Sequence, residues 1–410
     1  MRVKKGKIEY EFIGGKPSVR IYYNGIPLND YVTTILNTAP IVIADPFDQS
    51  TKQITIPRSV NNICNDVFDA IKIVKLTDKD EELAAYLAAR LFESFTPYWR
   101  VNLLNEAKDM LGIYFWKEVL KLTRDWEAIN SVKIHTGTPN FFLSENYFLV
   151  GDRDLAFVYL YDALEDDKIL NVLAPVFNYP HTAPASYTAT MHPDTANKMF
   201  YIVKEMRDRL SSYIVKFNAA YNGKFTIGDF DAKFRLNTAL GDVVSFFVYN
   251  FLYLLIIEKN TKPRSLNNDF SRLRSLDLFF NFCLVIDETL KVLYTIKKGK
   301  ITGEHYISNS ILWLCDDKKW ISESELQDFW GKKFLKLNGS EPDVIVPRLL
   351  MANEVWNGRL VPKEVFPLLV AYKFRNYGGH SIAQQQVITK EYAKILDQLI
   401  FALFIAINEM

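Results

Sequence analysis

The sequence has only three cysteines, Cys64, Cys283 and Cys315, and their spacing matches neither a disulfide framework nor a zinc site. Two of them lie in apolar stretches, so we expect buried thiols in a reduced compartment. No apolar run reaches the 18 or so residues that a membrane span needs, because the longest, residues 243–257, contains polar side chains. The basic N-terminus lacks the apolar segment of a signal peptide. These absences predict a cytoplasmic protein without a membrane span.

An excess of charge of either sign is also missing. The 49 basic and 48 acidic side chains leave a net charge of +1, so contact with nucleic acid would rely on local basic patches. The sequence contains no GxxxxGK[ST] phosphate loop, no HExxH zinc motif and no GxSxG nucleophile motif. Five histidines leave few general acid–base arrangements. We therefore expect neither a bound cofactor nor a catalytic metal.

The residues that are present change in pattern along the chain. Residues 1–60 hold short alternating stretches such as KIEYEFI, SVRIYY and KQITIP, broken by glycine-containing turns, which is typical of strands. From about residue 81 the apolar period becomes helical, and the high aromatic content, 14%, favours a phenylalanine-rich helical core. The sequence therefore predicts a mainly α fold. Its expected parts are a small β-rich unit at 1–80, a helical region at 81–225 and a helical bundle at 230–410.

Residues 141–164 resemble one helix pair of the tetratricopeptide type. With Gly151 at the turn between the helices, Ala156, Leu160 and Ala163 fall on the small and large packing positions of that repeat. Since no second copy follows, a lone pair of packed helices explains the pattern equally well. The helical region at 81–225 is a place where a protein or a small ligand could regulate the chain.

One hexapeptide carries residue types suited to catalysis: Arg375-Asn376-Tyr377-Gly378-Gly379-His380. In a regular helix Arg375 and His380 would lie about 140° apart, because successive residues turn by 100°. The pair Gly378-Gly379 permits a break that brings both side chains to one pocket. The Arg-to-His spacing, the asparagine after the arginine and the C-terminal helical setting resemble the Rx4–6H motif of the HEPN superfamily, over residues 230–410.

This resemblance implies a metal-independent endoribonuclease that uses the 2′-hydroxyl of RNA as the nucleophile. His380 would act as general base or acid, and Arg375 would present its fork of donors to the scissile phosphate. Asn376 would orient the phosphate or the imidazole, and Tyr377 would stack on a base or pack against the protein. The family pairs two motifs face to face, which implies a homodimer through the bundle, and its members are often toxins or defence effectors.

Residues outside the hexapeptide complete the expected site. Lys297, Lys298 and Lys300 could follow an RNA backbone, although lysine-rich turns are commonly only solvated. Asp287 and Glu288 are possible polar partners of the motif, or ordinary surface charges. Two other functions stay open: a non-catalytic helical interaction scaffold and a nucleotide-binding module. For the hexapeptide itself, the alternative is a plain loop whose histidine, His380, caps a helix.

Overall fold

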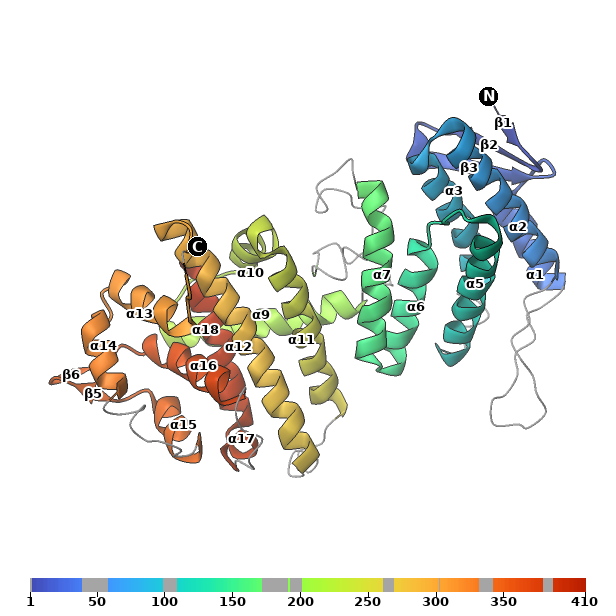
Figure 1. The fold of residues 1–410 in the computed structure, drawn as a ribbon. Helices are drawn as coiled ribbons and strands as arrows, with labels where there is room; N and C mark the ends of the chain where they lie inside the picture. The colour runs from blue at the N-terminus through green and yellow to red at the C-terminus, as the bar shows by residue number, and fades with distance from the viewer. Residues whose placement is uncertain are drawn as a thin grey trace. The chain divides into compact units, whose positions relative to one another are not determined.

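The computed structural model describes residues 2–38, 58–98, 109–171, 191, 201–260, 269–301, 303–331, 342–378 and 386–410. The chain divides into two compact units, Met1–Thr188 and Ala189–Met410, and each is described by itself. The fold is mainly α with a four-stranded antiparallel sheet near the N-terminus, which confirms the predicted fold class (Figure 1). Unit 1 contains both the expected β-rich part and the first portion of the expected helical region.

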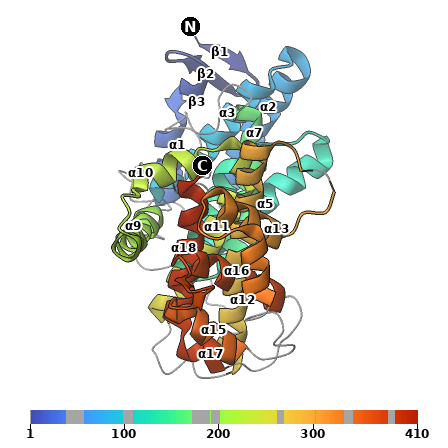
Figure 2. The same ribbon diagram turned by 90° about the vertical axis from the view of Figure 1, so that its left-hand side faces the viewer.

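The sheet of unit 1 is a simple antiparallel meander. Its strands follow the order β1 (Val3–Lys5), β2 (Ile8–Phe12), β3 (Val19–Tyr23) and β4 (Ile26–Pro27). The turn between β3 and β4 is Asn24-Gly25, where both residues have positive φ values, 51° and 78°. Such values define the type I′ turn that matches the twist of a hairpin. One face of the sheet buries alternate residues, those of β3 against helix α3 (Glu81–Glu93) and those of β2 against helix α2 (Arg58–Ile73) (Figure 2).

Helices begin earlier in the chain than the sequence predicted. Both α1 (Leu28–Thr38) and α2 (Arg58–Ile73) lie within the part that was expected to be β-rich. Helix α2 forms because its buried residues Val60, Ile63 and Val67 recur at helical spacing, a pattern that the alternating stretches before it obscured. The strand-like stretch KQITIP lies outside the described residues. The remaining helical elements of unit 1 are η2 (Val74–Asp78), α4 (Thr96–Tyr98), α5 (Asp109–Asn130), α6 (Gly137–Val150) and α7 (Arg153–Asn171).

The expected helix pair is present as α6 and α7. Gly151 ends α6 with a φ of 81°, and its N–H donates to the carbonyl of Phe148 at 3.1 Å. A residue other than glycine would be strained in this left-handed conformation. Ala156, Leu160 and Ala163 are completely buried, so the small and large packing positions are confirmed as contact positions. Whether the pair belongs to a repeat family stays a prediction.

Unit 2 is a helical bundle arranged around α12 (Asp269–Lys298). This helix has 30 residues, a length of about 45 Å. It packs against α11 (Gly241–Asn260), α13 (Ile307–Asp317), α16 (Val365–Gly378) and α18 (Tyr392–Asn408) (Figures 1 and 2). The other elements are α9 (Tyr201–Tyr221), α10 (Ile227–Phe230), η5 (Asp231–Arg235), η6 (Thr238–Leu240), α14 (Glu323–Trp330), α15 (Pro342–Met351), the hairpin β5 (Val355–Trp356) and β6 (Arg359–Leu360), and α17 (Gln386–Lys390).

Aromatic rings fill the centre of this bundle, as the composition predicted. Phe247 of α11 lies within ring-contact distance of four other phenylalanines, with centroids 5.2 to 6.1 Å away. All five rings are buried. The four neighbours are Phe230, Phe234, Phe251 and Phe282.

One stretch of the described residues, Thr238–Leu255, is long and apolar enough to cross a membrane by length and composition alone. Of that stretch, 56% is buried inside the protein. The core helix of a bundle passes the same test, and α11 packs on α12. The three cysteines are buried and unpaired, as expected, and burial raises the pKa of Cys64 to about 12, which keeps this thiol protonated.

Candidate functional site

The hexapeptide lies at the C-terminal end of α16. Arg375 and Asn376 occupy the last turn of this helix, which extends to Gly378. A cation in the last turn is favourable because carbonyl groups at the helix end carry partial negative charge. The side chain of Tyr377 and the whole of Gly379 and His380 lie outside the described residues. The structure therefore describes the arginine and the asparagine of the predicted site.

Arg375 is held by a buried carboxylate on the neighbouring helix. Its Nε lies 3.4 Å from Oδ2 of Asp287, which belongs to the middle of α12. The side chain of Asp287 is 5% exposed and that of Arg375 is 33% exposed. The guanidinium also lies over the ring of Phe280, with its carbon 5.3 Å from the ring centroid. One side of the guanidinium is thus fixed within the bundle while part of it still reaches solvent.

A second cation shares the same carboxylate. Lys291, one turn further along α12, places Nζ 3.4 Å from Oδ1 of Asp287 and 2.7 Å from Oε1 of Glu288. Burial raises the pKa of Asp287, and Lys291 and then Arg375 oppose this shift without cancelling it. The cluster of Asp287, Glu288, Lys291 and Arg375 carries two positive and two negative formal charges. Sequence reasoning proposed Asp287 and Glu288 as partners and missed Lys291, whose spacing of four residues from Asp287 was the available signal.

Asn376 points away from this cluster. Its side chain is exposed and hydrogen-bonds the hydroxyl of Tyr372, one turn back on α16. The ring of Tyr372 meets Trp330 edge to face, with centroids 3.9 Å apart. Burial raises the pKa of Tyr372, and the hydrogen bond from Asn376 opposes the shift. Arg375 and Asn376 therefore lie on adjacent but distinct sides of the helix end, as the 100° turn between neighbours requires.

One histidine that the sequence did not single out lies close to the cluster. The Nε2 of His305 is 2.8 Å from the hydroxyl oxygen of Ser310, and its ring centroid is 4.6 Å from that of Tyr294. Burial and then the charge of Lys291 lower the pKa of His305, so the imidazole is neutral at pH 7. His305 stands alone between two helices, so no spacing in the sequence associates it with Asp287.

The three predicted RNA-binding lysines are exposed and lie apart from Arg375. Lys297 and Lys298 end α12, and Lys300 follows it. Ten residues separate Lys297 from Asp287, a distance of about 15 Å along the helix axis. They form a basic end of α12, and contact with RNA remains a prediction.

Substituting Asp287 with asparagine tests the cost of burying this carboxylate. Because burial raises its pKa above the ordinary value of 3.8, the folded protein binds this proton more tightly than the unfolded chain does. The stability that protonated Asp287 contributes is fully present below the pKa of the unfolded chain. It is lost as the pH rises through the raised pKa of the folded protein. We expect the free energy of unfolding of Asp287→Asn, measured in urea, to rise relative to that of the wild type between about pH 4 and about pH 7.

The matched control is Glu288→Gln on the same helix, whose side chain is 53% exposed. Its difference from the wild type should change less with pH than that of Asp287→Asn, because Glu288→Gln leaves the buried carboxylate in place. If the free energy of unfolding of Asp287→Asn fell relative to that of the wild type as the pH rises, the expected sign would be wrong.

Among the described residues, no group of three or more histidine, cysteine, aspartate or glutamate side chains is arranged to hold a metal ion. Comparison with known proteins adds no assignment: no family model, no curated protein and no solved structure matches the chain. The likeness to the HEPN superfamily thus depends on the hexapeptide and its helical setting.

Proposed function

We propose that this protein is a metal-independent endoribonuclease that cleaves RNA through its 2′-hydroxyl at a site containing Arg375, Asn376 and His380. The observation that carries the proposal is the guanidinium of Arg375, oriented by buried Asp287 and still partly open to solvent at the end of α16. His380 follows five residues later, beyond Gly378-Gly379. An arginine fixed on one side by a carboxylate is preorganised to receive a phosphate on the other.

Each residue has a defined part in the proposed reaction. The 2′-hydroxyl oxygen attacks the adjacent phosphorus and the bond to the 5′-oxygen breaks. His380 either accepts the proton of the 2′-hydroxyl or, in its protonated form, donates a proton to the departing 5′-oxygen. Arg375 stabilises the negative charge that grows on the phosphate oxygens. Asn376, which bonds Tyr372 on another side of the helix end, would have to turn toward the phosphate or the imidazole to orient it. The products are a 2′,3′-cyclic phosphate and a 5′-hydroxyl.

The proposed enzyme is a cytoplasmic homodimer. Two copies of the motif would form one composite site through the C-terminal bundle, as in the family that the hexapeptide resembles. Tyr377 and the lysines at the end of α12 would contact the RNA. Residues 81–225 would receive the protein or small ligand that regulates cleavage, and a toxin or defence role fits such regulation.

Cleavage of a fluorescent RNA in the presence of EDTA tests the proposal. The substrate is a 20-nucleotide single strand with a fluorophore and a quencher, and its matched control carries 2′-deoxyribose throughout. We expect cleavage of the RNA, no cleavage of the control, and cyclic phosphate ends detected by mass spectrometry. Equal cleavage of both strands, or cleavage only after Mg²⁺ is restored, would contradict a 2′-hydroxyl mechanism.

A second candidate function is an interaction scaffold, favoured by one observation in unit 1. Helix α7 exposes the apolar side chains of Leu155 and Val158 together with Tyr161, all at a spacing of three residues along one side. A purified dimer that cleaves no RNA in the assay above would leave this function, or nucleotide binding by the bundle, as the alternative. Isothermal titration calorimetry with ATP and GTP distinguishes these two functions, because only the nucleotide-binding function predicts that a nucleotide binds.

A further inference from the structure

A cavity of about 480 Å³ lies within unit 1, beside the segment 131–136 that joins α5 to α6. The helices α3, α5 and α7 and the short helix η2 contribute the other walls. Four of the lining side chains are almost completely buried, with exposed fractions of 2 to 6%: Ala85, Leu120, Ile134 and His135. The volume is typical of sites for small molecules, and the three aliphatic side chains favour a ligand with an apolar part.

The segment that joins α5 to α6 is held in place at two points. The N–H of Ile134 donates to Oε1 of Glu127 on α5 at 2.7 Å. Thr136 donates both its N–H and its hydroxyl to Oδ2 of Asp166 on α7, at 2.8 and 2.5 Å. This wall of the cavity is therefore ordered before any ligand arrives, which lowers the entropic cost of binding.

Four of the charged side chains that line the cavity are already paired with one another. Nζ of Lys75 lies 2.6 Å from Oε2 of Glu81, and Nζ of Lys133 lies 3.2 Å from Oε2 of Glu127. Each pair contains one charge of each sign. These four side chains therefore leave no net charge for a ligand to neutralise.

Two further lining charges, of opposite sign, lack an ion-pair partner among the described residues. Arg124 is exposed, and there its guanidinium has no hydrogen bond and no carboxylate within 4.0 Å. Asp166 accepts both hydrogen bonds of Thr136 through Oδ2, and its Oδ1 accepts none from a described residue. The cavity thus offers one guanidinium and one carboxylate oxygen that a ligand can use.

A neighbouring acid strengthens the negative charge around Asp166. Partial burial and then the charge of Asp166 raise the pKa of Asp162, while the charge of Arg124 lowers it. An ammonium group placed beside Asp166 would relieve this repulsion between carboxylates. Because both charges act on Asp162, the side chains of Arg124 and Asp166 lie close enough for one small molecule to contact both.

We propose that this cavity binds a small zwitterion with an apolar body, an amino acid or a short peptide with free ends. Its ammonium group donates to Oδ1 of Asp166, its carboxylate accepts from the guanidinium of Arg124, and its apolar side chain packs on Ala85 and Leu120. A plain anion would leave Asp166 without a cation, and a plain cation would leave Arg124 without an anion. The site lies within unit 1 and does not depend on the proposed ribonuclease activity of unit 2.

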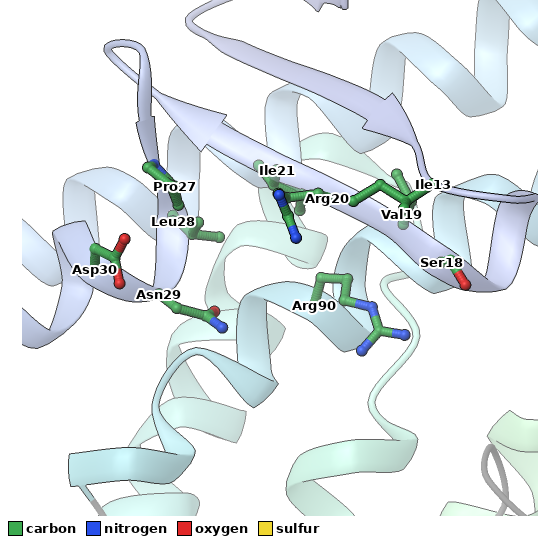
Figure 3. A pocket seen from close by; sticks show the side chains of 10 residues that line it. All are labelled: Ile13, Ser18, Val19, Arg20, Ile21, Pro27, Leu28, Asn29, Asp30 and Arg90. Atoms are coloured by element: carbon green, nitrogen blue, oxygen red, sulfur yellow. The ribbon is translucent and has the colours of Figure 1, made fainter.

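A larger cavity of unit 1, about 650 Å³ in volume, lies beside the sheet and provides a comparison (Figure 3). Arg20 and Asp30 line it, and both are exposed. Neither side chain forms a hydrogen bond with another described residue, so no charge is fixed there as Asp166 is. Arg20 is therefore a suitable control for an arginine that lines a different cavity.

Isothermal titration calorimetry of the full chain with defined ligands tests the proposal. The probes are L-leucine and the dipeptide Leu-Leu, each with free ends, with an acetylated amino group, or with an amidated carboxyl group. We expect saturable binding of a free-ended ligand, and blocking either end should weaken it roughly tenfold or more, because each end loses a charged hydrogen-bond partner. The tighter binder of the two identifies the natural ligand as an amino acid or a peptide.

Substitutions assign each end of the ligand to its partner. Arg124→Gln should weaken binding of the free-ended ligand roughly tenfold or more and should not weaken the amidated ligand further. Asp166→Asn keeps an acceptor for Thr136 and should have the corresponding effect at the amino end. Arg20→Gln should leave binding unchanged. If Asp166→Asn fails to fold, Arg124→Gln still decides, because its side chain is exposed.

Three outcomes would overturn the proposal. They are no saturable binding of either free-ended ligand up to about 10 mM, equal binding of a blocked and a free-ended ligand, and equal binding by the wild type and Arg124→Gln. Acetylated leucine that binds as tightly as leucine would indicate a site for anions instead. RNA cleavage by the same preparations reports separately on unit 2.

Discussion

Substituting His380 with alanine is expected to lower the rate of RNA cleavage by about 10²–10⁴-fold, the usual contribution of a positioned general acid or base. Arg375→Ala should lower it by about 10²–10³-fold, because the charge that develops on the phosphate loses its preorganised donor. Single-turnover cleavage of the fluorescent RNA with EDTA present measures both effects. For His380→Ala the loss should appear in kcat, with little change in RNA affinity.

Two further variants make this prediction specific. Arg375→Lys keeps the positive charge but loses the fork of donors, so it should retain an intermediate rate. His181→Ala changes another histidine of the chain and should cleave like the wild type. Sedimentation must show the same oligomeric state for every variant. Wild-type cleavage rates in both His380→Ala and Arg375→Ala would show that the hexapeptide is not the active site.

The substitution Phe247→Ala should produce the largest loss of stability, about 3–5 kcal/mol. This ring is completely buried and touches four other rings, so its removal leaves a cavity that rigid aromatic neighbours fill poorly. Urea unfolding, followed by tryptophan fluorescence and circular dichroism, measures the loss.

The adjacent Phe246 supplies the control. It is half-buried on the same helix, so Phe246→Ala should cost about 1 kcal/mol and leave the bundle folded. Equal losses for the two variants would mean that the aromatic cluster contributes no more than an ordinary apolar position. Both variants replace a phenylalanine with alanine at neighbouring positions of the same helix, so their helix propensity and composition are matched.

The bundle was predictable from the sequence because helical period and apolar content agree over long segments. The expected bundle at 230–410 contains the long helix α12, the expected pair at 141–164 corresponds to α6 and α7, and Gly151 marked the turn correctly. The helices α1 and α2 were missed for a local reason. Both directly follow short alternating stretches, and an 11-residue helix such as α1 gives only three turns of pattern.

The candidate site was predictable only in part. The hexapeptide and the possible partner Asp287 could be named from residue types, but the pairing of Arg375 with Asp287 joins positions 88 apart in the sequence. No single-sequence pattern carries that information, because it arises from the way α16 packs on α12.

The length of α12 has a consequence for how the bundle opens. Five other helices pack along it, so the amides of its buried part should exchange with solvent only when the whole unit unfolds, whereas the last turn of α16 is expected to fray independently. We therefore expect the amide of Asp287 to exchange among the slowest of the unit and that of Arg375 to exchange faster. Fraying of α16 would then move the arginine while the carboxylate stays in place, so the guanidinium would be oriented for a phosphate only while the last turn of α16 stays helical.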